Sequence, residues 1–304
     1  MDDARSVLRE YRALFSDAVA KEYEYMAEHT SFRIGGPARL MLLPKGAEQL
    51  SAAIQTTRKY GMRSLIMGNG TNLLVSDEPL DIAIIKTCDG VGGVCINESG
   101  VVEAGSGVLL SRIASFALAN SLSGMEFAHG IPGTLGGGLS MNAGAYGGEL
   151  KDVLLDVKVL NCDGEEKTYS SDECRFSYRH SRIADEGSAV ISARIRLCPG
   201  ETAAIRAHME ELSGKRRSSQ PLRVPSAGST FKRPPGGYAA ALIDEAGLRG
   251  YAIGGAQVSE KHAGFIINRG GASFEDVIRL MEHVKNTVFV RFGIELEPEV
   301  KIIR

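Results

Sequence analysis

Residues 130–150 read GIPGTLGGGLSMNAGAYGGEL, and eight of these 21 residues are glycine. Glycine lets the backbone approach a bound group closely and readily adopts positive φ angles, so glycine-rich loops recur where phosphates are bound. The same composition also suits tight turns, or a helix packed closely against a strand. Taken alone, the stretch favours neither interpretation.

The stretch follows neither of two common nucleotide-binding patterns. No Gly-Lys-Ser/Thr run follows it, which excludes a P-loop. It also does not follow a predicted strand, so the Rossmann fingerprint fails. A phosphate would therefore have to be bound by backbone amides and by hydroxyls such as those of Thr134 and Ser140.

Two shorter glycine runs lie in the same half of the chain. Gly68–Asn72 reads GNGTN and Gly105–Gly107 reads GSG, each at the end of a predicted strand. Each run alone is typical of a turn. Three such loops are able to converge on one extended ligand. If that ligand contains a ring, residues 142–144 would bring backbone to the edge of the ring.

Composition narrows the class of protein. With 304 residues, 43% hydrophobic, 24% charged, a net charge of -2 and a mean hydropathy of -0.06, the chain is typical of a globular protein without a membrane-spanning segment. The charge balance gives no sign of nucleic-acid binding. Because the start is acidic and amphipathic, unlike a signal peptide, we expect a cytoplasmic location.

The five cysteines and six histidines form no ligand motif, so we expect neither a disulfide framework nor a metal site. Most of the cysteines are expected to be buried.

Apolar spacing and turn signals predict an α+β fold in which the proportion of helices and strands changes along the chain. The expected helices lie at about 3–23, 47–61, 108–123, 201–221, 238–248 and 273–292. Two strands around a Gly-Gly turn are expected over 29–44, a hairpin turn at 162–167, and further strands at 63–68, 73–77, 82–87, 93–96, 101–105, 153–161, 188–197 and 294–303. The division that fits is 1–88, 89–200 and 201–304, with the last strand returning to the active site.

Six motifs occur in order along nearly the whole chain: HTSFRIGGPA (29–38), GNGTNLLVSD (68–77), the glycine stretch, FSYRHSR (176–182), KRRSSQPLRVPSAGSTFKRP (215–234) and LEPEV (296–300). Together they resemble the UDP-N-acetylenolpyruvoylglucosamine reductase family of peptidoglycan synthesis. The resemblance implies an FAD-binding domain of the vanillyl-alcohol-oxidase (PCMH) type in two subdomains, 1–88 and 89–200. A C-terminal α/β substrate-binding domain, 201–304, would complete the chain.

The same resemblance implies the reaction. An FAD-dependent, NADPH-using oxidoreductase (a UDP-N-acetylmuramate dehydrogenase) would reduce the enolpyruvyl group of UDP-N-acetylglucosamine enolpyruvate to give UDP-N-acetylmuramate. Arg179 matches the arginine that binds the carboxylate, and Ser229 the residue that donates the proton. Glu299 matches the glutamate that assists the developing enolate, and only the motif separates it from Glu297.

The resemblance also implies the binding residues. For the cofactor they are Gly68, Asn69, Gly70, Thr71, Asn72, Gly105, Gly130, Pro132, Gly133, Thr134, Gly137, Asn142, Gly144 and Ala145. For the diphosphate and carboxylate of the nucleotide sugar, the reasonable polar contacts within these motifs and in residues 256–262 are Lys215, Arg216, Gln220, Lys232, Gln257 and His262, with Lys261 a further one. Any one of these basic residues is equally typical of a solvated surface.

The chain departs from the family pattern at two places. Arg233 stands where many members have asparagine, which puts any direct contact from that position in doubt. The segment 181–197 is too short for the tyrosine-bearing loop of one branch of the family. The chain is therefore expected to belong to the shorter branch, with the element that covers the substrate unidentified.

Two alternatives remain open. One is another flavin oxidoreductase of alcohols or sugars on the same scaffold, for which His129 is the obvious candidate for a covalent flavin tether. The other is a nucleotide-sugar binding module without turnover. The presence of Arg179, Ser229 and Glu299 argues against this second alternative, because binding alone requires no acid at Ser229.

Overall fold

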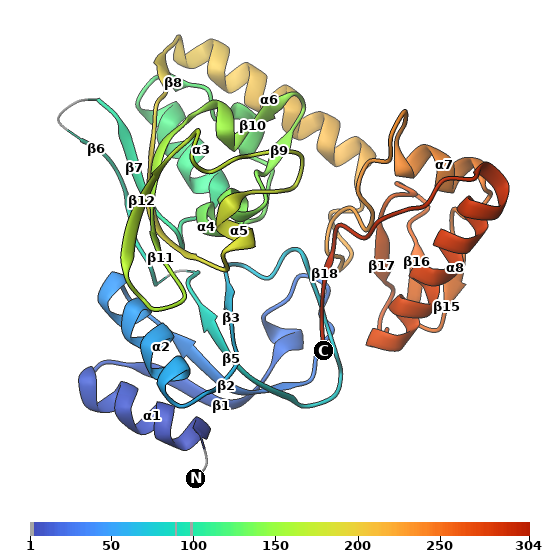
Figure 1. Ribbon diagram of the computed structural model, residues 1–304. Helices are drawn as coiled ribbons and strands as arrows, with labels where there is room; N and C mark the ends of the chain where they lie inside the picture. Colours follow the sequence, from blue (N-terminus) through green and yellow to red (C-terminus); the bar gives the residue numbers. More distant parts are fainter. Residues whose placement is uncertain (1–2, 89, 98–99) are drawn as a thin grey trace. The chain divides into compact units, whose positions relative to one another are not determined.

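The computed structural model describes residues 3–88, 90–97 and 100–304, and the chain forms two compact units (Figure 1). Unit 1 comprises residues 1–22, 39–69 and 81–215, and unit 2 comprises 23–38, 70–80 and 216–304. The chain therefore crosses between units five times. The three-part division expected from the sequence stays a prediction, and its first boundary adjoins residue 89, which lies outside the described residues.

Unit 1 is built on two sheets, with strand orders β1-β2-β5-β3 and β12-β11-β13-β7-β6. β3 and β5 are parallel, whereas the five-stranded sheet is antiparallel throughout. The main elements are α1 (Asp3–Leu14), β1 (Val19–Tyr25), β2 (Pro37–Leu43), α2 (Ala47–Lys59), β3 (Ser64–Met67), β5 (Leu80–Lys86), β6 (Val94–Ile96), β7 (Val102–Gly105), α3 (Leu110–Ala119), β11 (Leu154–Leu160), β12 (Glu166–Ser170), β13 (Ala189–Ile195) and α6 (Thr202–Ser219).

Short elements fill the connections of unit 1. They are β8 (Leu122–Ser123), η2 (Glu126–Ala128), α4 (Leu135–Ser140), β9 (Gly144–Ala145), β10 (Gly148–Glu149), η3 (Leu150–Asp152), α5 (Arg182–Asp185) and β14 (Cys198–Pro199). β8 pairs with β14, and β9 pairs with β10. The glycine stretch therefore contains a short helix, α4, followed by a two-stranded ribbon.

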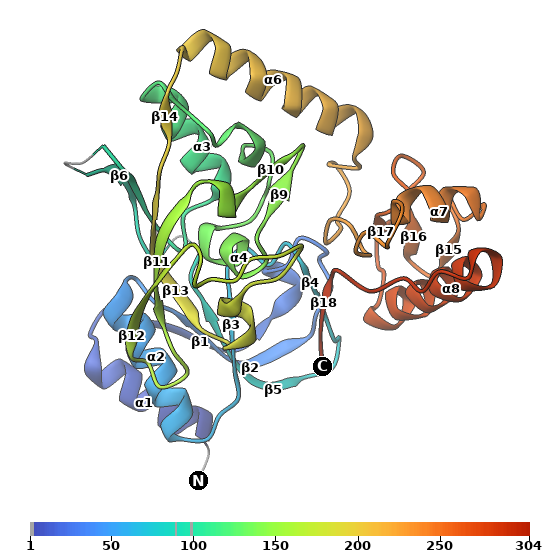
Figure 2. The same cartoon turned by 45° about the horizontal axis from the view of Figure 1, so that its top comes forward.

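Two hydrophobic cores hold unit 1 together. In one, α1 and α2 bury Val7, Tyr11 and Leu50 against Leu40 and Ile85 of the four-stranded sheet. Figures 1 and 2 show these two helices beside that sheet. The other core lies among α3, α4, α6 and the five-stranded sheet. Burial of these apolar faces is the main term that stabilises the unit.

Unit 2 contains a three-stranded antiparallel sheet, β15-β16-β17, packed against a long helix, α8. A parallel pair joins β4 to β18. The elements are η1 (Met26–Glu28), β4 (Leu73–Val75), α7 (Ala239–Glu245), β15 (Ala252–Ile253), β16 (Ala256–Val258), β17 (Ile266–Asn268), α8 (Phe274–Phe292) and β18 (Lys301–Ile303). α8 begins with a capping box between Ser273 and Asp276 and ends at Gly293, which adopts a left-handed conformation.

Three sequence predictions of secondary structure are wrong in part. The first helix ends at Leu14, because Asp17 accepts hydrogen bonds from Lys45 and Gln49 and residues 19–25 then pair with β2. Residues 29–36 form no strand, since the buried Thr30 hydroxyl donates to the carbonyl of Ile34 and holds a turn. The last strand covers only 301–303, because residues 297–299 bond to residues 230–232 instead.

Most other predicted helices and strands are confirmed with shorter bounds, including α2, α3, α6 and α8 and the hairpin between β11 and β12. The expectation that most cysteines are buried is wrong: Cys88 and Cys174 are buried, but Cys95, Cys162 and Cys198 are exposed. The exposed three lie in a sheet-edge strand, a hairpin turn and a two-residue strand. Within the described residues, no helix is both long enough and apolar enough to span a bilayer.

Candidate functional site

Ser229 and Glu299 lie on neighbouring backbone segments of unit 2. The amide of Glu299 donates to the carbonyl of Thr230 at 2.8 Å, and Phe231 forms a bridge with Pro298. Thr230 is buried, its amide donates to Gly264, and its hydroxyl accepts from the amide of Ile266 at 3.0 Å. Thr230 therefore anchors the segment, while Ser229 and Glu299 remain partly exposed.

The structure separates the two glutamates of the LEPEV motif. The side chain of Glu297 is 72% exposed and pairs with Lys232 at 3.1 Å. Glu299 is partly buried, and its carbonyl accepts a hydrogen bond from the side-chain amide of Asn72 at 3.1 Å. Glu299 is thus the glutamate in the less solvated position.

Arg179 lies in unit 1, on a tight turn with a left-handed backbone. Its φ is +56°, and the turn is closed by reciprocal hydrogen bonds between the backbones of Ser177 and His180. A non-glycine residue pays a conformational cost at such an angle, so surrounding contacts must hold it there. The guanidinium lies 5.1 Å from the ring centre of Tyr178.

The glycine loops contact one another within unit 1. The amide of Gly136 donates to the carbonyl of Ser106, and the side-chain amide of Asn69 donates to the carbonyl of Pro132. Thr134 is buried, and its hydroxyl accepts from Gly137 as the N-cap of α4. Gly70, Thr71 and Asn72 belong to unit 2.

The glycines of α4 serve different purposes. A Cβ added at Gly136 would lie 3.0 Å from Ser106, and one at Gly138 would lie 2.8 Å from Leu150. The close packing of α4 therefore leaves no room for a side chain at either position. A Cβ at Gly137 would approach nothing nearer than the Thr134 hydroxyl, at 3.6 Å, and Gly137 is exposed. Packing among the described residues therefore does not require glycine at 137, whereas a group bound against that backbone would.

Unit 2 contains a cationic pocket of about 560 Å³. Arg217, Arg223, Lys261 and Arg269 line it against a single carboxylate, Glu260. Two residues expected from the sequence, Gln220 and Gln257, also line it. This set of hydrogen-bond donors suits an anionic ligand, because one guanidinium group can bind two oxygens of a phosphate or carboxylate at once.

Sequence reasoning had not selected the three arginines of this pocket. Arg217 stands in a basic run of which only Lys215 and Arg216 were chosen, while Arg223 and Arg269 are isolated in the sequence. Only folding brings them together, so no local pattern identifies them.

Other residues expected to bind substrate have partners within the protein. Lys215 pairs with Glu211 one helical turn away, and Lys232 pairs with Glu297. His262 is half-buried, and burial lowers its pKa. Its Nδ1 accepts from the amide of Gly264 at 3.2 Å, which places the proton of the neutral ring on Nε2. His262 therefore offers a neutral donor rather than a cation.

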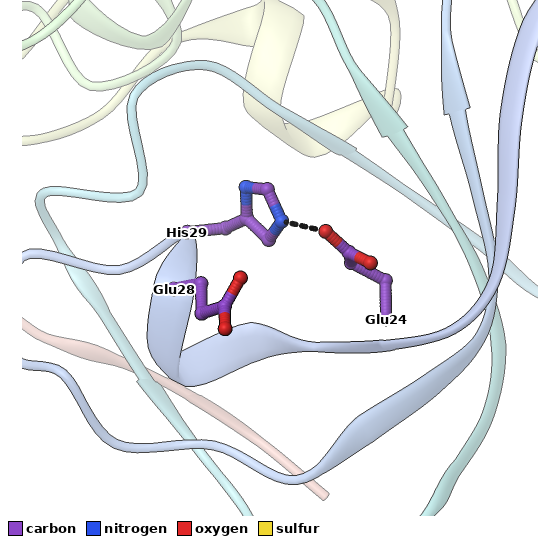
Figure 3. Close-up of side chains that lie close together, drawn as sticks. All are labelled: Glu24, Glu28 and His29. Carbon is purple, nitrogen blue, oxygen red and sulfur yellow. Dashed lines mark hydrogen bonds and ion pairs between the residues drawn. The ribbon is translucent and has the colours of Figure 1, made fainter.

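A cluster that the sequence did not indicate lies at the start of unit 2. Glu24, Glu28 and His29 point toward one another (Figure 3). Each offers one atom that could ligate a metal ion, and these three atoms lie within 4.8 Å of one another. His29 Nε2 lies 2.9 Å from Glu24 Oε1, and Glu28 is exposed. The three residues follow no ligand spacing, and the His29–Glu24 pair accounts for the two less exposed members.

His129, the candidate flavin tether, has its Nδ1 3.2 Å from the hydroxyl of Ser213. Cys174, which precedes the arginine-bearing turn in the chain, is buried, and burial raises the pKa of its thiol to about 11. A thiol with so high a pKa remains protonated and is unreactive at neutral pH.

Comparison with known proteins first identifies the class. Residues 38–170 match the FAD binding domain family, which covers the converging glycine loops of unit 1. Residues 220–303 match the family described as UDP-N-acetylenolpyruvoylglucosamine reductase, C-terminal domain, which covers Ser229, Glu299 and the lining of the cationic pocket other than Arg217. The chain thus has the domains of a flavoprotein reductase.

Whole-chain relatives define the family. UDP-N-acetylenolpyruvoylglucosamine reductase of Agathobacter rectalis is 47% identical over 291 residues, and that of Caldanaerobacter subterraneus is 48% identical over 280 residues; each match covers 92% of both chains. The crystal structure of the Thermus caldophilus enzyme superposes with a TM-score of 0.81 at 32% identity, covering 94% of this chain and 99% of that one. The chain belongs to the UDP-N-acetylenolpyruvoylglucosamine reductase family.

Proposed function

We infer that this protein is an FAD-dependent, NADPH-using reductase that converts UDP-N-acetylglucosamine enolpyruvate to UDP-N-acetylmuramate. The observation that carries this proposal beyond family membership is the pairing of Thr230 with Glu299. That pairing brings the expected proton donor and the expected glutamate onto adjacent segments. Bound FAD supplies the redox chemistry, and the protein supplies placement, charge and the proton.

We propose that each of the three motif residues has a separate task. Reduction of the double bond places negative charge on the carbon beside the substrate carboxylate, and a fixed cation or hydrogen-bond donor lowers that barrier. The Arg179 guanidinium binds the carboxylate, and the Ser229 hydroxyl donates the proton to carbon. Glu299 donates a hydrogen bond to the developing enolate when its carboxyl group is protonated.

Gly137 supports the assignment of the cofactor to the glycine loops. Glycine inside a helix costs about 1 kcal/mol relative to alanine, and no described neighbour requires it at this position. An open backbone at Gly137 suits close approach of the flavin nucleotide. We propose contacts from Gly68, Asn69, Gly70, Thr71, Asn72, Gly105, Gly130, Pro132, Gly133, Thr134, Gly137, Gly144 and Ala145, with Asn142 contributing only its backbone.

The cationic pocket of unit 2 fits the diphosphate of the nucleotide sugar. Its four cations face one carboxylate, and Gln220 and Gln257 add neutral hydrogen-bonding groups. We propose that Arg217, Arg223 and Arg269 contact the diphosphate together with the expected Gln220 and Gln257. Lys215, Arg216, Lys232 and His262 remain proposals for the rest of the substrate, and the cytoplasmic location also remains a proposal.

An anaerobic spectral titration tests this function. The purified protein is expected to show a flavin spectrum that bleaches with NADPH and recovers on adding UDP-N-acetylglucosamine enolpyruvate. Recovery only with a different acceptor would replace the proposed substrate. Failure to retain or rebind flavin would remove the proposed role of the glycine loops.

The proton donor has its own prediction. In Ser229→Ala, NADPH is expected to bleach the flavin at a rate near that of the unaltered protein, while reoxidation by the enolpyruvyl sugar slows by roughly 100-fold or more. Stopped-flow absorbance of the two half-reactions measures both rates. Ser226→Ala, altered on the same segment, is the control, and normal turnover of Ser229→Ala would exclude Ser229 as the donor.

A further inference from the structure

Asn142 lies in the glycine stretch, but its side chain is turned into the protein. It is 1% exposed, and all its hydrogen-bonding groups are engaged within unit 1. Its Nδ2 donates to Glu149 Oε2 at 2.5 Å and to the carbonyl of Ser177 at 3.3 Å, while its Oδ1 accepts from the amide of Lys151 at 3.1 Å. Both N–H groups of Nδ2 are engaged and the side chain is buried, so it is not available to a flavin.

Chemistry fixes the orientation of this amide. Lys151 offers an N–H, which only an oxygen can accept. The carboxylate of Glu149 and the carbonyl of Ser177 offer only acceptors, which the –NH₂ group must face. A flipped amide would oppose like groups at all three contacts, so the assignment does not depend on an arbitrary choice.

The contact with Ser177 reaches the turn that carries Arg179. Ser177 and His180 close that turn, and Arg179 between them has a φ of +56°. At the other end, the buried Ser181 donates through Oγ to the carbonyl of Ser140 at 2.8 Å and caps α5. Residues 140–142 therefore hold both ends of the turn.

We propose that Asn142 is a positioning residue that holds Arg179 for the substrate, acting through the carbonyl of Ser177. This inference rests on the proposed role of Arg179 in binding the substrate carboxylate. A loosened turn displaces the guanidinium without touching the flavin. Loss of the contact is therefore expected to impair the half-reaction with the enolpyruvyl sugar and to spare the half-reaction with NADPH.

A double substitution isolates the contact. In Asn142→Asp with Glu149→Gln, the glutamine amide donates to the new carboxylate, and the amide of Lys151 still has an acceptor. The ion pair between Lys151 and Glu149 is lost in Glu149→Gln as well. Relative to that single variant, the double variant loses the donor to Ser177, which is replaced by an acceptor that faces a carbonyl. Glu149→Gln alone keeps Asn142 as donor and is the matched control.

The expected result is a flavin affinity, flavin spectrum and rate of reduction by NADPH within about twofold of those of Glu149→Gln, with reoxidation by the enolpyruvyl sugar slowed roughly 10- to 100-fold. Reduction slowed as much as reoxidation, or weakened flavin binding, would make Asn142 a flavin ligand and overturn the proposal. Reoxidation equal to that of the control would also overturn it.

A second variant decides the matter if the double variant is unfolded. Asn142→Gly suits the φ of +45° at this position and simply removes the side chain, with Ser121→Gly, at φ +56° in another turn, as its control. Asn142→Gly is expected to slow reoxidation in the parent but to have little further effect in Arg179→Lys. An undiminished effect in Arg179→Lys would show that Asn142 does not act through Arg179.

Measurements on the unaltered protein distinguish failure of the proposed function from failure of the proposed role of Asn142. If its reduced flavin is not reoxidised by the enolpyruvyl sugar, the proposed function fails. If it is reoxidised normally and the Asn142 variants behave like their controls, only the positioning role fails.

Discussion

Tyr11 is a fully buried residue of α1 whose hydroxyl has no hydrogen-bond partner among the described residues. An unsatisfied buried hydroxyl loses its bonds to water without replacement. Burial also raises the pKa of Tyr11 to about 12 from its usual 10, because the charged form is poorly solvated. The hydroxyl therefore destabilises the fold, while the ring contributes to the core of unit 1.

Tyr11→Phe is expected to raise the free energy of unfolding by about 1 kcal/mol, since it removes the unpaired group and keeps the ring. Tyr60→Phe is the control, because the hydroxyl of Tyr60 donates to Glu10 at 2.7 Å, and its loss should lower stability by about 1 kcal/mol. Urea unfolding measures both. A loss of stability in Tyr11→Phe would mean that its hydroxyl has a partner, such as water, that the contacts do not reveal.

The lowered pKa of His262 leads us to expect that the stability of the fold depends on pH. Burial lowers its pKa below the usual 6.5, so the unfolded chain takes up a proton at this residue before the folded protein does. The resulting stability is present above pH 6.5 and is lost as the pH falls through the folded pKa.

Melting temperatures between about pH 7.5 and 5.5 test this expectation. His262→Asn retains an acceptor for the amide of Gly264 but cannot titrate, so its melting temperature should fall less on acidification than that of the unaltered protein. His208→Asn, on the exposed face of α6, should follow the unaltered protein. Equal slopes for all three proteins would contradict the prediction.

Neighbouring glycines of the short helix α4 have different surroundings. Gly136 and Gly138 allow α4 to lie against Ser106 and Leu150, and the buried Thr134 caps its first turn. A Cβ at Gly137, between them, would meet only the Thr134 hydroxyl, at an ordinary contact distance of 3.6 Å. Close packing thus accounts for Gly136 and Gly138, whereas ligand binding remains the proposal for Gly137.

Gly137→Ala is expected to leave the melting temperature of the flavin-free protein unchanged or higher, because alanine is the better helix former, while weakening FAD binding by roughly tenfold or more. Gly138→Ala, by contrast, should lower the melting temperature, because its new methyl group would meet Leu150 at 2.8 Å. Flavin fluorescence titration gives the affinities. Unchanged FAD affinity in Gly137→Ala would remove this residue from the cofactor site.

The protein as a whole has separate cores in its two units, although the chain crosses between them repeatedly. Leu139 of α4 is fully buried in a core of unit 1, and Leu280 of α8 is fully buried in that of unit 2. Arg179 belongs to the first unit, and Ser229 and Glu299 belong to the second. The three proposed catalytic residues therefore depend on two different cores.

Leu280→Ala and Leu139→Ala are each expected to lower stability by about 2–5 kcal/mol through the cavity they leave. Hydrogen exchange followed by mass spectrometry should show lost protection mainly in α8 and β16 for Leu280→Ala, and mainly in α3 and β13 for Leu139→Ala. Each variant is the control for the other. Equal loss of protection throughout the chain in both would show that the two units unfold as one.

Local sequence by itself determined much of this protein. The apolar spacing of α2, α6 and α8 identified them, because a helix closes its hydrogen bonds within four residues and buries one face. The ordered motifs identified the family, and the glycine runs marked the loops that meet in unit 1. These features depend on residues close together in the chain, or on the order of short patterns.

Tertiary structure alone decided the rest. Residues 19–25 became a strand because β2 lies beside them, and the pocket arginines gathered from separate segments. Only the folded chain shows that Asn142 faces Ser177 and that Asn72 holds Glu299, 227 residues away. Buried polar groups need partners, and those partners come from parts of the sequence that no local pattern connects.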